Sequence, residues 1–380
     1  MELSDLLNTM VDREASDLYL TAESPPVFRI EGMTQPINDH LLTTDEVTEF
    51  ASAVMDDRQK LEFAENLEMN LAMAPSGLGR FRVNLFRQKG NVAIVIRRIK
   101  VDIMTLDQLG LPSTLKDVAL TKNGLVLVVG GTGSGKSTTL AAMIDHRNST
   151  SGGHIISVED PIEFVHQHKR SIMSQREVGF DTHSFPGALK NAMRQAPDVI
   201  LIGEIRDTET MESAITFADT GHLCLGTLHS TNANQCFERI LNFFPEARHD
   251  QVLMQLSLNL RCIVSQRLIP SENGKRVAAL EVLMDTPRIQ DLIRNGKIDI
   301  LKEAMEQGIH EGCQTFDQAL LILFKEGKIS VEQALAHADS TNNLRLKIKL
   351  EGLKGADAID KLLGKNEPEQ EKALRIRGSG

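Results

Sequence analysis

The sequence has few cysteines and no paired ones. It contains Cys224, Cys236, Cys262 and Cys313, which are widely spaced and form no C-x-x-C pair. Zinc knuckles and disulfide frameworks are recognised by close or regular cysteine spacing. The pattern suggests neither of these, and reduced thiols are expected.

Long apolar runs are also lacking. No stretch approaches the roughly 18 to 20 apolar residues that a helix needs to cross a bilayer. The first residues, Met1–Asp5, do not combine a basic region with an apolar one, as a secretory leader does. We therefore expect a cytoplasmic protein with no direct membrane insertion, which reaches the membrane only through partners.

The sequence has no excess of basic residues. It contains 42 lysine and arginine residues against 52 aspartate and glutamate residues, so its net charge is -10. This balance opposes the general attraction to phosphate backbones that drives non-specific nucleic-acid binding. No nucleic-acid partner is expected, and a DNA-translocating motor is the weaker alternative.

One glycine-rich segment, in contrast, matches the phosphate-binding pattern G-x-x-x-x-G-K-[ST]. It follows the apolar run Leu125–Val129, which has the character of a buried parallel strand, and it precedes Thr138–Ile144, which can start a helix. The candidate nucleotide-binding residues are Gly130, Gly131, Thr132, Gly133, Ser134, Gly135, Lys136, Ser137 and Thr138. The alternative is an ordinary glycine-rich turn, but strand, loop and helix in this order favour a nucleotide site.

Each residue type in this loop suits a nucleotide. Glycines let backbone N–H groups surround phosphate oxygens, and a helix N-terminus adds partial positive charge. Lys136 can reach the outer phosphates, and the Ser137 hydroxyl can ligate Mg²⁺. We therefore expect a nucleotide hydrolase that uses ATP and Mg²⁺.

The length of 380 residues and a hydrophobic content of 41% predict two or more domains with well-packed cores. The expected organisation is an N-terminal α+β domain (1–103), an interdomain linker (104–117), an α/β core (118–285), a helical C-terminal subdomain (286–350) and a charged tail, loosely helical or disordered (351–380). The last three residues, Gly378–Gly380, are either native or an artificial addition, and we leave them out of the fold prediction.

Local patterns give the expected elements. The N-terminal part has a strand around Leu18–Leu20, a helical stretch over Thr44–Leu67, and a hairpin with one basic face, made from Phe81–Leu85 and Val92–Ile96. In the core, the apolar runs after the glycine loop are spaced to allow intervening helices, as in a parallel α/β sheet. These runs are Ile155–Val158, Val199–Ile202 and Leu223–Thr227.

Carboxylates and histidines follow or flank these runs. Glu163 belongs to an acidic cluster behind the first run, Glu204 follows the second, and His222 and His229 bracket the third. Ligands of open α/β sheets bind beyond the carboxyl ends of the strands, where such carboxylates can hold Mg²⁺ through water or activate the attacking water. The alternatives are solvated acidic turns and structural histidines, and the sequence leaves open which carboxylate activates water.

These sites, in this order, resemble the type II/type IV secretion ATPase superfamily, in which a P-loop, an Asp box, a Walker B glutamate and a His box occur. The resemblance extends to about Leu350 and narrows to pilus retraction ATPases of the PilT/PilU type. The segments that carry it are Ala15–Leu20, Gly79–Asn84 and Thr315–Leu320, while Gly221–Leu225, Asn232–Gln235 and Glu238–Asn242 are most similar to the PilU branch.

The resemblance implies a homohexameric motor that powers type IV pilus retraction and twitching motility. An N-terminal PAS-like domain docks against a neighbouring RecA-like core, with ATP between the domains and with arginines, favoured as Arg82 and Arg97 over Arg80, completing the site. The implied roles are phosphate and metal binding for Lys136 and Ser137, base and metal-side carboxylate for Glu163 and Glu204, and nucleotide sensing for His222 and His229. Ser137 and Glu204 are the implied Mg²⁺ ligands, the latter through water.

Assembly ATPases of this superfamily usually carry paired C-x-x-C motifs and a longer N-terminal region, so their absence favours retraction. The retraction motif Ala-Ile-Arg-x-Leu-Ile-Arg-Glu is represented by Arg288–Asn295, which keeps Ile289, Leu292, Ile293 and Arg294 and departs elsewhere. The departure suggests an accessory motor that acts with a PilT-like ATPase on an inner-membrane platform protein of the pilus. The alternative is a nucleotide-gated adaptor ring with little hydrolysis of its own.

Overall fold

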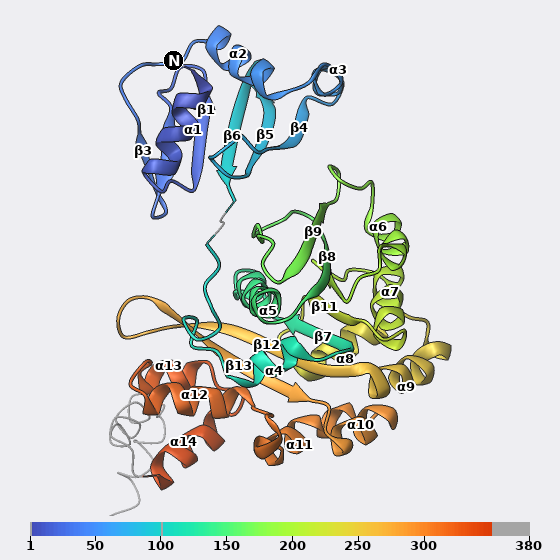
Figure 1. The fold of residues 1–380 in the computed structure, drawn as a ribbon. Helices are drawn as coiled ribbons and strands as arrows, with labels where there is room; N and C mark the ends of the chain where they lie inside the picture. The colour runs from blue at the N-terminus through green and yellow to red at the C-terminus, as the bar shows by residue number, and fades with distance from the viewer. Residues whose placement is uncertain (1, 100–101, 352–380) are drawn as a thin grey trace, which may run out of the picture. The chain divides into compact units, whose positions relative to one another are not determined.

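The computed structural model describes residues 2–99 and 102–351, and these form two compact units (Figure 1). The first unit comprises 1–103, 158–168 and 173–188, and the second comprises 104–157, 169–172 and 189–380. Apart from Glu351, the predicted charged tail lies outside the described residues. Within the described ranges, no helix combines the length and the apolar character needed to cross a membrane.

The first unit is built on an antiparallel sheet. Within residues 2–99 the sheet has six strands in the order β3-β2-β1-β6-β5-β4. The strands are β1 (Asp17–Thr21), β2 (Val27–Ile30), β3 (Met33–Pro36), β4 (Glu68–Met73), β5 (Phe81–Gln88) and β6 (Asn91–Arg98). The accompanying helices are α1 (Leu3–Asp12), α2 (Thr44–Val54) and α3 (Asp57–Asn66).

Side-chain alternation produces the β5–β6 hairpin. Phe81, Val83 and Leu85 are fully buried, while the residues between them are only partly covered. Lys89 and Gly90, with φ angles of 49° and 81°, form a two-residue turn, and the flanking residues pair as Gln88↔Asn91. The predicted hairpin is confirmed.

The predicted helical stretch over Thr44–Leu67 consists of two helices, α2 and α3. Asp56 caps the second one, because its side chain accepts a hydrogen bond from Gln59 N–H and the Gln59 side chain accepts one from Asp56 N–H. This reciprocal capping box satisfies backbone groups that a continuous helix would pair differently. The chain therefore turns between α2 and α3.

The larger sheet has most of its strands in the second unit, while the end of β8 and most of β9 are assigned to the first. Within the described residues it has seven strands in the order β13-β12-β7-β11-β10-β8-β9. They are β7 (Gly124–Val129), β8 (Gly153–Glu159), β9 (Ser171–Glu177), β10 (Val199–Ile202), β11 (Leu223–Leu228), β12 (Leu260–Pro270) and β13 (Arg276–Met284). β7 runs parallel to both β11 and β12, β11 runs parallel to β10, and β13 is antiparallel to β12.

Helices surround this sheet (Figure 1). They are α4 (Thr114–Leu120), α5 (Lys136–Thr150), α6 (Phe185–Ala192), α7 (Thr208–Asp219), α8 (Ala233–Leu241), α9 (His249–Asn259), α10 (Pro287–Arg294), α11 (Leu301–Gln307), α12 (Phe316–Lys325), α13 (Val331–Ala336) and α14 (Thr341–Leu350). Every residue of β7 and β11 is buried, as expected of strands covered on both faces. The three predicted core strands are confirmed as β8, β10 and β11, whereas β9, β12 and β13 were not foreseen.

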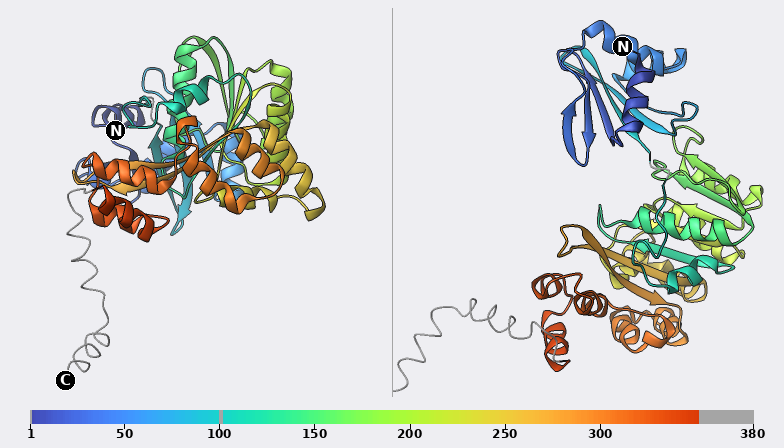
Figure 2. Two further views of the ribbon diagram at one scale, coloured as in Figure 1. Left: turned by 90° about the horizontal axis from the view of Figure 1, so that it is seen from below. Right: turned by 60° about the vertical axis from the view of Figure 1, so that its left-hand side comes forward.

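Helices α12, α13 and α14 share a core with the β12–β13 hairpin (Figure 2, red). Phe316 and Leu320 of α12 are fully buried in a cluster that also contains Ile269 of β12 and Ala279 of β13. The helical character predicted for this region is therefore confirmed, and it shares a core with the edge of the sheet.

The four cysteines lie in the described part of the chain, are all buried, and form no disulfide there. Burial raises the pKa of the Cys236 thiol to about 12, and burial raises the pKa of Cys224, Cys262 and Cys313 as well. These thiols act as small apolar side chains.

The α12 core predicts a contrast between two neighbouring positions. Leu320→Ala should destabilise the protein by about 2–5 kcal/mol, because it removes a fully buried side chain and leaves a cavity. Ile322→Ala, on the same helix but 45% exposed, should cost about 0.5 kcal/mol. Urea unfolding followed by circular dichroism measures both, and equal losses would contradict the packing.

Candidate functional site

The glycine loop joins β7 to α5 and packs tightly at its two ends. A Cβ on Gly130 would lie 2.4 Å from Ser134 Oγ, and one on Gly135 would lie 2.7 Å from Gln266 Nε2. Gly135 also has a φ of 90° and caps α5, a left-handed conformation that favours glycine. At both ends a larger residue would displace a neighbour.

The middle of the loop is open. A Cβ on Gly131 or Gly133 would meet no atom within 4 Å. Lys136 Nζ donates to the carbonyl oxygens of Gly130 and Gly131 at 2.9 and 3.0 Å, so its ammonium lies over the loop. The buried Ser134 hydroxyl has no hydrogen-bond partner among the described residues. An open cradle, a cation and an unpaired donor fit a phosphate group.

Oxygen groups suited to Mg²⁺ occur at the same end of the sheet. Ser137 lies in the first turn of α5, half-buried. No group of three or more His, Cys, Asp or Glu side chains in the described residues is arranged to hold a metal ion. Mg²⁺ in nucleotide sites is typically held by substrate phosphates, waters and one or two protein oxygens, so Ser137 and Glu204 fit this kind of site.

Glu204 follows β10 and is held from both sides. Its Oε2 accepts a hydrogen bond from Arg206 at 2.6 Å, and its Oε1 lies 3.2 Å from His229 Nε2. The next residue, Ile205, donates its N–H to the Thr227 carbonyl at 2.8 Å, which ties the end of β10 to β11. The carboxylate therefore sits at the edge of the sheet where the glycine loop emerges.

The pKa of Glu204 is lowered by its neighbours. Burial, the largest single effect, raises this pKa, but the hydrogen bond from Arg206 and the positive charges of Arg206, Lys136 and, when it is protonated, His229 together outweigh it. Glu204 is thus an anion at neutral pH, close to the cations Arg206 and Lys136.

The two predicted histidines lie at opposite ends of β11. His229 follows the strand and faces Glu204, whereas His222 precedes it and lies within hydrogen-bond distance of Thr220 Oγ1 (3.1 Å) and the Phe217 carbonyl (3.2 Å). A strand of this length spans roughly 20 Å. Within this chain, the structure therefore places His229 beside Glu204 and the glycine loop, and it places His222 at the other end of β11.

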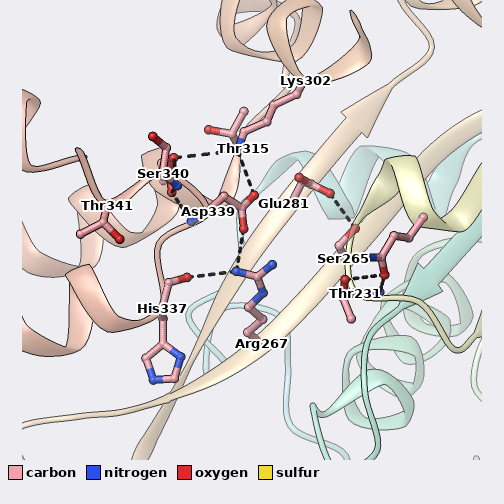
Figure 3. Close-up of polar contacts among 12 residues, drawn as sticks. Thr231, Ser265, Arg267, Glu281, Lys302, Thr315, His337, Asp339, Ser340 and Thr341 are labelled. Carbon is pink, nitrogen blue, oxygen red and sulfur yellow. Dashed lines mark hydrogen bonds and ion pairs between the residues drawn. The ribbon is translucent and has the colours of Figure 1, made fainter. Parts of the chain in front are cut away.

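Glu281 of β13 is a buried residue that our sequence analysis missed. It is 3% exposed, and its Oε1 accepts hydrogen bonds from Ala233 N–H at 2.7 Å and Ser265 Oγ at 2.9 Å (Figure 3). Burial raises its pKa, although these hydrogen bonds partly offset the effect. Because Ala233 begins α8, Glu281 anchors the segment that follows His229. The sequence feature that could have indicated Glu281 is a single glutamate within an otherwise apolar strand.

Glu163 lies in the first unit, on the loop after β8, and its side chain is exposed. The preceding residue, Ile162, donates its N–H to Glu177 Oε2 at 3.3 Å. Glu177 is 1% exposed and also accepts a hydrogen bond from Arg80 Nη2 at 3.1 Å. A part-buried ion pair therefore fixes the loop that presents Glu163, and Arg80 is engaged in it.

Arg82 and Arg97 stand directly opposite each other on β5 and β6, so their side chains share one face of the hairpin. Arg97 Nε donates to Asp17 Oδ1 at 2.7 Å, and Asp17 itself is 3% exposed. The Arg97 side chain remains 63% exposed. Asp17 thus orients an accessible guanidinium.

A glycine loop that fits phosphate, a helix that begins beneath it and an ionised carboxylate beyond the neighbouring strands define a protein of the P-loop nucleotide hydrolase class. Residues 3–345 match the family model described as "Type II/IV secretion system protein". The chain belongs to this family, and the resemblance drawn from its motifs is confirmed.

Its relatives include pilus ATPases over nearly the full length. The chain is 54% identical over 363 residues to the type IV pilus ATPase PilU of Pseudomonas aeruginosa, covering 95% of each chain. It is 42% identical over 343 residues to "Type IV pilus retractation ATPase PilT" of the same organism, covering 90% of this chain and 100% of that one.

A solved structure supports the fold. The crystal structure of the pilus retraction motor PilT with bound ADP superposes with a TM-score of 0.83 at 41% identity, covering 90% of this chain and 98% of that one. The predicted fold class, a RecA-like α/β core with an N-terminal α+β domain and a helical C-terminal region, is confirmed.

The contacts of Glu204 predict how its titration responds to a change at Arg206. Arg206→Met should raise the pKa of Glu204, because burial persists while the hydrogen bond and a positive charge are lost. Carboxyl carbon NMR, assigned with Glu204→Gln, measures the midpoint. Arg206→Lys keeps the charge and should produce a smaller rise. A midpoint that stays the same in both variants would contradict the assignment.

Proposed function

We propose that this chain is an ATP-hydrolysing motor subunit that powers type IV pilus retraction and twitching motility, as a PilU-like accessory of a PilT-like ATPase. The observation that carries the proposal is the conjunction of the phosphate loop and the Glu204–His229 pair in a chain 54% identical to PilU over 95% of its length. The PilT structure with bound ADP supports nucleotide binding at the matching fold.

In this proposal the loop N–H groups and Lys136 bind the outer phosphates of ATP. Ser137 and, through water, Glu204 hold Mg²⁺, which offsets the charge on the phosphates when bound. Glu163 is the second carboxylate. The fixed loop that presents it suits a base that orients and deprotonates water, while the cation-rich surroundings of Glu204 suit the metal side.

A ring completes the site. We assign Arg82 and Arg97 to the neighbouring subunit's nucleotide, in a homohexamer, because they share one face and Arg97 is oriented yet exposed. His229, beside Glu204, is the sensor of the terminal phosphate. His222 is bonded at the far end of β11, which argues against the same role within one chain.

Motion then follows from differential binding. ATP and ADP favour different arrangements, and the change between them is transmitted to an inner-membrane platform protein, so that the motor is peripheral to that membrane. The α10 segment, which departs from the retraction motif, supports an accessory role and also favours the second candidate function, a nucleotide-gated adaptor ring.

Two variants separate binding from hydrolysis. Lys136→Ala should abolish ATP hydrolysis, because the loop loses its cation. Glu204→Gln should still bind ATP but hydrolyse it at least about 100-fold more slowly, because it loses the metal-side carboxylate. Fluorescent-nucleotide binding and phosphate release measure the two steps, and normal turnover in both variants would refute the site.

Turnover at different protein concentrations tests the motor itself. For a ring whose sites need two subunits, ATP turnover per chain should rise with concentration and then reach a plateau. The measurement is steady-state phosphate release with and without a PilT-like partner, with Glu204→Gln as the blank. Activity that appears only with the partner would make the chain an accessory or adaptor subunit and would exclude a motor that assembles by itself.

A further inference from the structure

A buried hydrogen bond joins the first turn of α5 to β12. The Thr139 hydroxyl donates to Gln266 Oε1 at 2.7 Å, and the two side chains are 1% and 4% exposed. Thr139 lies three residues after Lys136, so this hydrogen bond is made by the helix turn that also contains Lys136. Gln266 itself is 127 residues away along the chain.

The same glutamine approaches the loop at both of its tight ends. An ideal Cβ on Gly130 would lie 2.7 Å from the Gln266 carbonyl oxygen, and one on Gly135 would lie 2.7 Å from Gln266 Nε2. Gln266 thus lies against the first and last glycines of the loop and bonds the helix beyond it. The contact with Gly130 is made by the backbone of Gln266, and those with Gly135 and Thr139 are made by its side chain.

The strand that carries Gln266 is firmly held. Gln266 pairs with Leu280 of β13, and the preceding Ser265 pairs with Val129, the last residue of β7 before the loop. The neighbouring side chains serve other contacts: Ser265 donates to Glu281, and Arg267 bonds Asp339 (Figure 3). Of these three consecutive residues, Gln266 alone contacts the loop through its side chain.

We propose that Gln266 is a positioning residue of the phosphate loop. By contacting Gly130, Gly135 and Thr139 together, it fixes the start of the loop relative to the N-terminus of α5, so that the loop N–H groups converge before nucleotide arrives. A glycine loop is costly to order, and ordering it in advance strengthens binding. The inference rests on the proposed function, since it assumes that this loop binds nucleotide.

Gln266→Met tests this with little change in side-chain length. ADP affinity, titrated with a fluorescent ADP analogue, should fall about fivefold, the usual effect of one lost hydrogen bond. Because the loop holds phosphates equally in ground and transition states, KM for ATP should rise by a similar factor while kcat stays within about twofold. Ile322→Ala, at an exposed position of α12, should leave both unchanged.

A double-mutant cycle identifies the partner. Thr139→Val should weaken ADP binding as Gln266→Met does, the double variant should be no weaker than either single one, and Thr139→Ser should restore binding because it keeps the hydroxyl. Additive losses, or unchanged affinity in Gln266→Met, would overturn the proposal. If Gln266→Met fails to fold by its thermal melt, the Thr139→Val and Thr139→Ser pair decides the outcome.

The wild-type chain and Lys136→Ala separate this inference from the proposed function. A wild-type chain that binds no ADP refutes the nucleotide site and the inference with it. A wild-type chain that binds ADP, with Lys136→Ala impaired and Gln266→Met normal, leaves the nucleotide site intact and refutes only the positioning role.

Discussion

The parallel pairing of β7 with both β11 and β12 decides where the functional groups of the second unit lie. Because the three strands run in one direction, the glycine loop, His229 and Gln266 lie toward the same edge of the sheet. The link from β10 to β11 brings Glu204 to that edge as well. Antiparallel pairing of β7 with β11 would separate the carboxylate from the loop.

Two carboxylates of this unit show how surroundings set chemical roles. Glu204 is partly exposed, and the cations around it lower its pKa. Glu281 is deeply buried, accepts hydrogen bonds from neutral donors, and has a raised pKa. Glu204 is therefore suited to interact with a charged ligand, whereas Glu281 is suited to hold a backbone segment in place. Residue type alone would not distinguish them.

The sequence predicts those parts of the fold and the candidate site whose residues are neighbours in the chain. It does not predict contacts between residues that are far apart in the chain. The loop was predicted together with its flanking strand and helix because their residues are adjacent in the chain, and Glu204 was a candidate because it follows the apolar run Val199–Ile202. Gln266 was missed because its contact with Thr139 spans 127 residues. β12 and β13 were missed because the predicted core contained this stretch without any strand assigned to it. His222 and His229 bracket one strand symmetrically, so only the direction of β11 separates them.

All four cysteines are buried, so their reaction with a thiol reagent detects transient opening of the fold. A thiol reagent reacts with the thiolate, and the raised pKa values leave almost none of it in the closed fold. Cys224 and Cys262 lie near the starts of β11 and β12, and Cys236 lies on α8. Alkylation during turnover therefore records transient opening of the core of the second unit, without any probe added to the protein.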